Sequence, residues 1–144
     1  MSFAGAQSER RIANVIRLGR VVSVDAGAAA AIVDLGGFTS PPLPVGQLGA
    51  GAIQFWWMPS AGEQVLIACE NGDIAAGIIV CSIYAGNAPS ADAAVPQIAL
   101  GGGTLMVDGT LEVTGDVIAQ GVSLLTHIHS GVDSGVQTSG EPVS

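Results

Sequence analysis

An alternation of apolar and polar residues runs through the last third of the chain. Aliphatic residues and glycines recur at every second position, and the first nine positions form three copies of aliphatic-x-aliphatic-x-Gly-x. The full set is Leu105, Val107, Gly109, Leu111, Val113, Gly115, Val117, Ala119, Gly121, Ser123, Leu125, His127 and His129. Polar residues such as Asp108 and Thr110 occupy the other parity. Because successive strand residues point to opposite faces, the pattern predicts an extended ribbon with one apolar face.

A single ribbon of this kind cannot bury its apolar face, so the repeat needs stacked neighbours. Three chains wound around one another would share a thin core and keep the polar residues outside. We therefore expect residues 98–125 to form the shaft of an intertwined trimeric β-helix. A single-chain left-handed β-helix of hexapeptide turns is the alternative, but three hexads make only one coil of it.

Residues 19–84 contain a succession of short strand patterns, which is typical of a small β-barrel. Pro41, Pro42 and Pro44 restrict their segment to an edge or a loop, and Asn71-Gly72 predicts a type I′ hairpin turn. The strands that we expect are Arg20–Asp25, Ala30–Leu35, Ile53–Met58, Glu63–Glu70 and Ile74–Ile83. Short strands at this density favour an OB-type barrel. The predicted fold is thus all-β, an N-terminal OB-fold barrel followed by a trimeric β-helix spike.

Three further segments flank the barrel and the shaft. Residues 1–18 form an N-terminal arm in which Ser8–Leu18 is expected to be a short amphipathic helix. Residues 85–97 contain Gly, Asn, Ser and Pro and are interpreted as a linker, too short for an inserted catalytic domain. Residues 126–144 form a polar apex segment.

Charge is distributed unevenly along the 144 residues. The net charge is −8, there is no lysine, and all four arginines lie in the first twenty residues. An acidic protein repels phosphates, so no nucleic-acid partner is expected. An OB-fold nucleic-acid-binding module with a trimerising tail remains the alternative function, although such modules use basic grooves. No apolar run reaches the roughly 20 residues that span a bilayer, and we expect assembly in the cytoplasm. Cys69 and Cys81 are expected to be buried, reduced thiols.

His127 and His129 are the only histidines of the chain. Residues i and i+2 of a strand share a face, so a continuous strand would point both imidazoles at the trimer axis. Three chains would then supply six nitrogens, a set that suits an octahedral transition ion better than tetrahedral zinc. Iron is the first choice, with nickel or cobalt as alternatives. A metal surrounded by protein ligands has no exchangeable position, so the site would be structural.

Two other interpretations of the His-x-His pair are weaker. The histidines would be ordinary solvated loop residues if the array did not lead into them. Metallohydrolase and cupin sites need further ligands, including a third histidine that this chain lacks. No nucleophile–base pair stands out either. We therefore expect no catalytic residues, no cofactor-binding residues beyond the metal ligands, and no small-molecule substrate.

Several motifs resemble those of one known family. Arg17-x-Gly-Arg-Val-Val-x-x-Val-Asp25, Trp57-Met-Pro-x-x-Gly-Glu-Gln-Val65, Gly72-Asp-x-x-x-Gly77 and Ser82-Ile-Tyr84 are similar to the amino-terminal barrel of phage baseplate assembly protein V, the central spike of contractile tails. Thr126-His-Ile-His-Ser-Gly131, followed by Thr138-Ser-Gly-Glu-Pro142, resembles the apex motif of the same family. The resemblance extends over essentially the whole chain.

The resemblance implies a non-enzymatic homotrimeric needle located in the tail baseplate of the virion. Its barrel end would attach to the hub and tail tube, and its tip would be driven through the host outer membrane when the sheath contracts. His127 and His129 would be the ligands of one iron ion per trimer. Some related spikes carry a lysozyme domain between barrel and helix, for which residues 85–97 leave no room.

Overall fold

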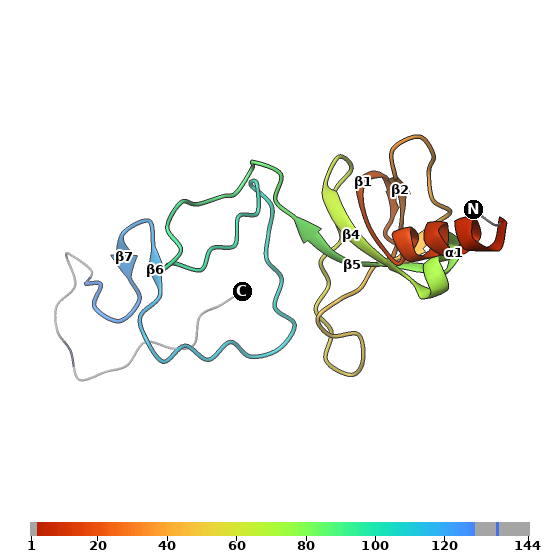
Figure 1. Ribbon diagram of the computed structural model, residues 1–144. Coiled ribbons are helices and arrows are strands. Elements are labelled where there is room, and N and C mark those ends of the chain that lie inside the picture. The colour runs from red at the N-terminus through yellow and green to blue at the C-terminus, as the bar shows by residue number, and fades with distance from the viewer. Residues whose placement is uncertain (1–2, 129–134, 136–144) are drawn as a thin grey trace. The chain divides into compact units, whose positions relative to one another are not determined.

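The computed structural model describes residues 3–128 and residue 135, and it divides into two compact units, Met1–Gln97 and Ile98–Ser144 (Figure 1). Each unit is described by itself. The elements of the first unit are the helix α1 (Phe3–Asn14), the strands β1 (Ile16–Asp25), β2 (Ala30–Asp34), β3 (Leu43–Pro44), β4 (Gln64–Cys69) and β5 (Gly77–Ile83), and the 3-10 turns η1 (Glu70–Gly72) and η2 (Ile74–Ala76). No helix among the described residues is long and apolar enough to cross a membrane.

The five strands of the first unit form one antiparallel sheet in the order β3-β2-β1-β4-β5. The sheet curls strongly (Figure 1), and the register shift in β1 between Val21 and Ser23 marks a bulge of the kind that bends strands. Its two edges meet, because Val45 forms a parallel bridge with Ile79, and the Gly46 N–H donates a 2.8 Å hydrogen bond to the Ile79 carbonyl oxygen. The result is a five-stranded, partly open barrel, as expected for an OB domain.

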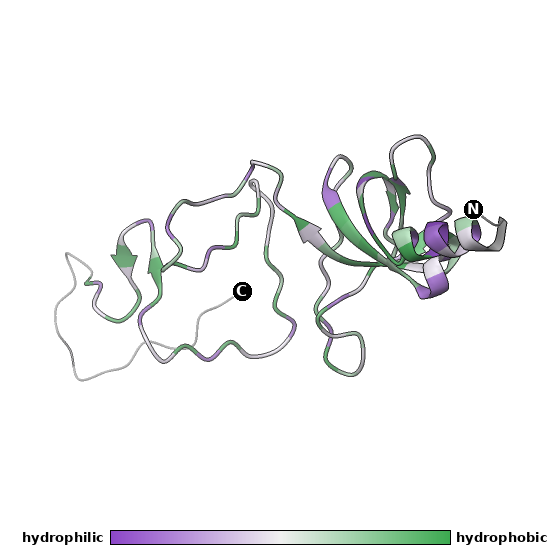
Figure 2. Ribbon diagram, viewed as in Figure 1, coloured by the Kyte–Doolittle hydropathy of each residue, from purple (hydrophilic) through white to green (hydrophobic). Residues whose placement is uncertain are grey.

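The core of this barrel consists of side chains from alternate strand positions. In β4, Val65, Ile67 and Cys69 point inward and are buried, which confirms the predicted face of this strand. Leu43 and Ile79 complete the contact between the two sheet edges, and both are fully buried. Figure 2 shows the corresponding apolar colouring along β4 and β5.

Two predicted strands and the predicted edge segment agree with the structure, but the predicted hairpin turn does not. The Ala30–Leu35 and Glu63–Glu70 strands correspond to β2 and β4, and the proline-rich segment contributes only the two-residue edge strand β3. Asn71 and Gly72 have the expected positive φ values of 53° and 70°. The predicted two-residue hairpin is nevertheless wrong, because η1 and η2 extend the connection before β5 begins at Gly77.

The predicted helix Ser8–Leu18 is displaced from the observed one. The helix α1 ends at Asn14, and Ile16 already pairs with Ala68 as the first residue of β1. Ile16 and Leu18 pair with β4 and therefore belong to a strand, although the apolar spacing also fits a helical face. Pairing across the sheet overrides the weak local helix preference of these residues.

The predicted strand Ile53–Met58 is also wrong. This part of the chain belongs to the 46–63 loop between β3 and β4, which contains one isolated bridge from Ala50 to Gln54. The backbone N–H of Trp57 is bound by the side chain of Gln47 instead of a neighbouring strand, at 2.9 Å. A side-chain amide therefore satisfies the hydrogen bond that a sheet partner would have satisfied.

The second unit contains one small hairpin within its described residues, formed by β6 (Ile118–Ala119) and β7 (Val122–Ser123). No other strand forms between residues 98 and 128, where the backbone is extended or turning. The large apolar side chains of this segment are exposed in the single chain, with Leu111 at 70% and Met106 at 86%. The trimeric β-helix remains a prediction, because its partners would come from other chains.

Candidate functional site

The β6–β7 hairpin places His127, the first of the two predicted metal ligands. Gln120 and Gly121 form its turn with φ values of 50° and 84°, the positive values that a two-residue I′-type turn requires. Beyond the strands, the Leu124 N–H donates to the Val117 carbonyl oxygen at 2.8 Å, which extends the pairing by one step. The chain that leads to His127 is therefore anchored by local hydrogen bonds.

Ser123 then turns the chain through a single helical turn. Its carbonyl oxygen accepts a 3.2 Å hydrogen bond from the His127 N–H, and its hydroxyl oxygen accepts one of 3.0 Å from the Thr126 N–H. An i→i+4 bond that is not continued defines an α-turn. This turn fixes the position of the His127 backbone relative to the hairpin.

The imidazole of His127 is oriented by two backbone carbonyl groups. Its Nδ1 atom lies 3.0 Å from the Ser123 oxygen and 3.1 Å from the Leu124 oxygen. Carbonyl oxygens only accept hydrogen bonds, so Nδ1 is the donor in both contacts, and a metal ion would be bound through Nε2. Metal-ligating histidines characteristically donate their other ring N–H to such a carbonyl or to a carboxylate. The donor chemistry of His127 thus fits a metal ligand that binds through Nε2.

Asp116 supports the same turn from the other side of the hairpin. Its Oδ1 atom accepts a 3.2 Å hydrogen bond from the Leu125 N–H. The hydrogen bond from Ser123 is the largest influence on this exposed carboxyl group, and together with backbone donors it holds the pKa of Asp116 below its ordinary value. The ionised form of Asp116 is therefore the one that fits the folded turn.

The hairpin corrects the expected parity of the alternating array. Across the Gln120–Gly121 turn, Ile118 pairs with Ser123 and Ala119 pairs with Val122. Paired residues share a face of a hairpin, so Ser123 lies on the face of Ile118 and not on that of Ala119. The prediction of one uninterrupted face from Leu105 to the histidines is therefore wrong, because a two-residue turn reverses the parity.

The second predicted ligand, His129, lies outside the described residues. Among those that are described, no three His, Cys, Asp or Glu side chains come close enough to hold a metal ion. Within one chain, the described part of the site is the exposed imidazole of His127 with its two carbonyl partners. The six-histidine site stays a prediction about several chains.

A groove on the barrel domain was not anticipated from the sequence. It has a volume of about 1150 Å³ and lies between the 46–63 loop and β5. Apolar and aromatic side chains dominate its walls, among them Phe55, Trp57, Val80 and Ile83, and Arg20 is the one cation among its described lining residues. The sequence pattern predicts a strand for the tryptophan segment and therefore does not reveal this surface.

The aromatic wall of the groove is held by Gln47 and by ring stacking. The Gln47 side chain donates to the Trp57 carbonyl oxygen at 3.2 Å and accepts from the Trp57 N–H at 2.9 Å. The rings of Phe55 and Trp57 stack with centroids 6.2 Å apart and an interplanar angle of 5°. Both sets of contacts pre-organise the loop beside β5.

The two cysteines differ in their surroundings, which corrects the expectation that both are buried. Cys69 lies in the core, and burial raises the pKa of its thiol. Cys81 is exposed on β5 and lines the groove. Both are free thiols.

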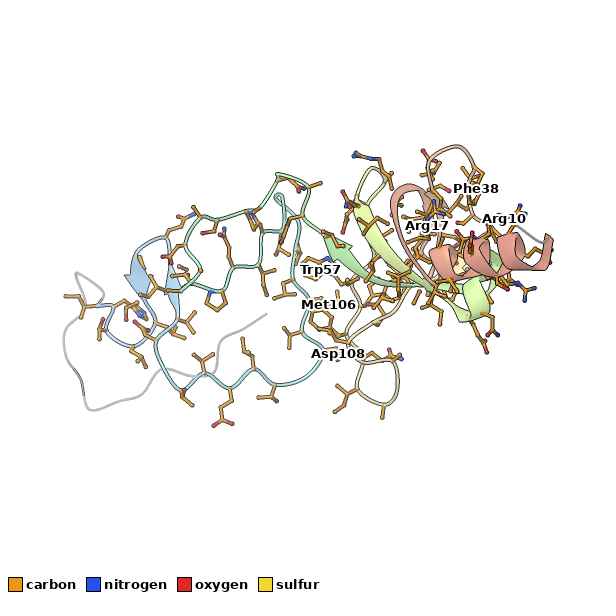
Figure 3. All side chains as sticks on the ribbon, viewed as in Figure 1. Arg10, Arg17, Phe38, Trp57, Met106 and Asp108 are labelled. Carbon is orange, nitrogen blue, oxygen red and sulfur yellow. The ribbon has the colours of Figure 1, made fainter. Side chains whose placement is uncertain are left out.

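The side chain of Arg17 contacts three parts of the barrel domain. Its guanidinium donates to the Asn14 side-chain oxygen at 2.7 Å and to the Leu35 carbonyl oxygen at 2.9 Å. The same group lies over the Phe38 ring, 6.0 Å from its centroid (Figure 3). Arg17 thereby joins the end of α1 to the end of β2 and the loop that follows.

Comparison with known proteins places this barrel in a family. Residues 17–84 match the family of the type VI secretion system/phage-baseplate injector OB domain. The chain is also 37% identical over 81 residues to the spike protein of Escherichia phage P2. That alignment covers 56% of this chain and 38% of the relative, so it spans well under half of the relative's length. In residues 17–84 the chain therefore carries the OB domain of the phage-baseplate and type VI injector family, which confirms over this domain its resemblance to the baseplate central spikes.

Proposed function

We propose that this protein is the structural central spike of a contractile tail baseplate. The observation that carries the proposal is the injector OB domain at residues 17–84, together with the similarity to a phage spike protein. In this role the barrel end attaches to the hub and tail tube, and the C-terminal end forms the distal tip of the virion tail. Assembly takes place in the host cytoplasm, and neither nucleic acid nor a small-molecule substrate is bound.

The apolar side chains of the second unit support the proposed homotrimer. Leu111 and Val107 are exposed in a single chain, as are Leu105, Val113 and Val117 at the same alternate positions of the array. Exposed apolar residues that recur on one face of a segment are typical of an interface. Two further copies of the same ribbon supply matching apolar positions at the same spacing, so three chains bury what one chain leaves exposed.

The tip is stabilised by one iron ion per trimer in this proposal. His127 and His129 of three chains provide six imidazole ligands, and the carbonyl groups of Ser123 and Leu124 set the His127 tautomer that ligation requires. The ion would cross-link the three chains, and its binding free energy would add to the stability of the folded trimer. A stiff tip suits a needle that pierces the outer membrane on sheath contraction.

Native mass and elemental analysis of the same sample test this proposal. We expect a trimer with one transition metal ion per three chains, and loss of the metal in the variants His127→Ala and His129→Ala. The matched control is Thr114→Ala, an exposed polar position of the array outside the apex. A monomer, or one metal ion for each chain, would overturn the proposal.

A further inference from the structure

The proposed metal-stabilised tip assigns no role to the barrel groove or to the loop beside it. Figure 1 shows this 46–63 loop in ochre, protruding from the curled sheet. At its end, the side chain of Ile53 is 87% exposed. An apolar projection and an apolar recess are thus present on the same domain.

The projection has a defined shape. The Phe55 N–H donates to the Gly49 carbonyl oxygen at 2.9 Å, and Ala50 forms a bridge with Gln54. A Cβ atom at Gly49 would lie only 3.0 Å from the Ile53 carbonyl oxygen, so the loop closes tightly at this glycine. Ile53 is therefore presented by a closed turn, which limits the conformational entropy that it would lose on binding.

Both surfaces are neutral, although the chain as a whole carries a net charge of −8. No charged residue occurs between Asp34 and Glu63, or between Asp73 and Asp92, and these two stretches supply the loop and β5. Among the described residues that line the groove, Arg20 and Glu63 alone are charged, and their charges are opposite. Two copies of so acidic a protein repel each other least where such neutral surfaces meet.

We propose that the Ile53 turn of one copy docks in the barrel groove of a second copy. A projection that binds a different surface on its neighbour makes a head-to-tail contact, which forms a closed ring when the rotation fits. The groove, with its volume of about 1150 Å³, has room for the turn and its side chain. This inference rests on the proposed homotrimer and adds to it a ring of three barrel domains.

The contact does not need high affinity of its own. If the shaft holds three chains together, each barrel domain is tethered near two others, and short flexible linkers give effective concentrations of about millimolar. A weak apolar contact is then sufficient to order the barrels. The ring would present three equivalent barrel surfaces on one axis.

A cysteine cross-link tests the contact in the full-length protein. The variant Ile53→Cys places a thiol on the projection, and the native Cys81 is an exposed thiol in the groove. On mild oxidation with copper phenanthroline in air, we expect covalent species of two and three chains on a denaturing gel without reductant. The double variant Ile53→Cys/Cys81→Ser should lose them, and Ala28→Cys, at an exposed turn away from the groove, should not form them.

A non-covalent measurement provides an independent readout. Ile53→Asp brings a charge into the apolar groove, so the emission of Trp56 and Trp57 should shift to longer wavelength as these rings become more hydrated. The control is Ile12→Asp at a similarly exposed apolar position on α1, with 73% exposure, which should leave the emission unchanged.

The outcomes separate this inference from the proposed function. A native trimer in which Ile53→Cys cross-links no more than Ala28→Cys overturns the groove contact and leaves the spike proposal standing, with the groove open to another protein. A monomeric wild-type protein overturns the homotrimer and the groove contact together. A covalent trimer that depends on Cys81 supports both.

Discussion

The hydroxyl oxygen of Ser40 accepts a 3.0 Å hydrogen bond from the backbone N–H of Val33, and the Ser40 N–H donates a 2.8 Å bond back to the Val33 carbonyl oxygen. Ser40 is the one buried polar side chain found among the described residues. The Ser40 side chain thus adds one hydrogen bond to β2 beside the backbone bridge between Asp34 and Thr39. The barrel core is closed beside Val33 by this exchange.

Replacing Ser40 by Ala should destabilise the barrel domain. The Val33 N–H would remain buried without its acceptor, and such a loss costs about 1–3 kcal/mol of unfolding free energy. Urea denaturation followed by tryptophan fluorescence measures the change. Thr39→Ala is the matched control, because Thr39 is exposed and its substitution should stay within about 0.5 kcal/mol. Equal stabilities of the two variants would contradict the assigned role of the hydroxyl group.

Gly72 is expected to be essential for the docking of α1. A Cβ atom at this position would overlap the Arg11 carbonyl oxygen at the end of the helix, and the residue also has a φ of +70°. Gly72→Ala should therefore lower both the unfolding free energy and the helical circular dichroism signal. In Gly36→Ala, where φ is +80° and nothing lies within 4 Å, only the backbone strain of about 1–2 kcal/mol should appear. The difference between the variants isolates the helix contact.

The barrel could be predicted because its strands carry local signals. Val65, Ile67 and Cys69 alternate with less buried residues, and the prolines before β3 identify an edge. The start of β1 and the 46–63 loop could not be predicted in the same way. Ile16 becomes a strand residue by pairing with Ala68, and the Trp57 N–H donates its hydrogen bond to the Gln47 side chain. Both outcomes depend on partners that are not adjacent in the sequence.

The candidate site was only partly predictable, because the sequence gives no signal for one turn that precedes it. His127 is a clear candidate from its rarity and spacing, but the face on which it lies depends on the turn at Gln120 and Gly121. A Gly in an alternating array also fits a straight strand, and Gln120 gives no signal for a positive φ. The pattern therefore singles out His127 as a candidate ligand but does not predict the turn that precedes it.

The apex turn should lose order in acid. The pKa of Asp116 is lowered on folding, so its ionised form stabilises the turn at pH values above the ordinary carboxyl pKa, and this contribution disappears as the pH falls through the lowered pKa. The amide resonances of Leu125 and Thr126 should follow this titration in NMR spectra. In Asp116→Asn, which keeps a carbonyl acceptor but does not titrate, they should be insensitive to pH over the same range. An unchanged titration in that variant would assign the effect to another group.

Arg17 should be replaceable by Lys only with a loss of stability. A lysine can reach one of the two oxygens that the guanidinium binds, on Asn14 and Leu35, and it lacks the planar face that lies over Phe38. We expect Arg17→Lys to lower the unfolding free energy by about 1 kcal/mol, and Arg17→Ala by more. Thermal unfolding measures both changes. Arg10→Lys is the control, because Arg10 bonds within its own helix, to the Ala6 carbonyl oxygen, and it should leave the transition unchanged.

The hydrogen bonds that carry the chain from Asp116 through the hairpin to the His127 ring begin and end within residues 116–127. These hydrogen bonds are therefore local, and none of them needs a residue that precedes Asp116 in the sequence. Insertion or deletion of a whole hexad before Asp116 would change the reach of the shaft and leave these hydrogen bonds unaltered. In the proposed spike, the length of the shaft and the chemistry of the tip could thus vary separately during evolution.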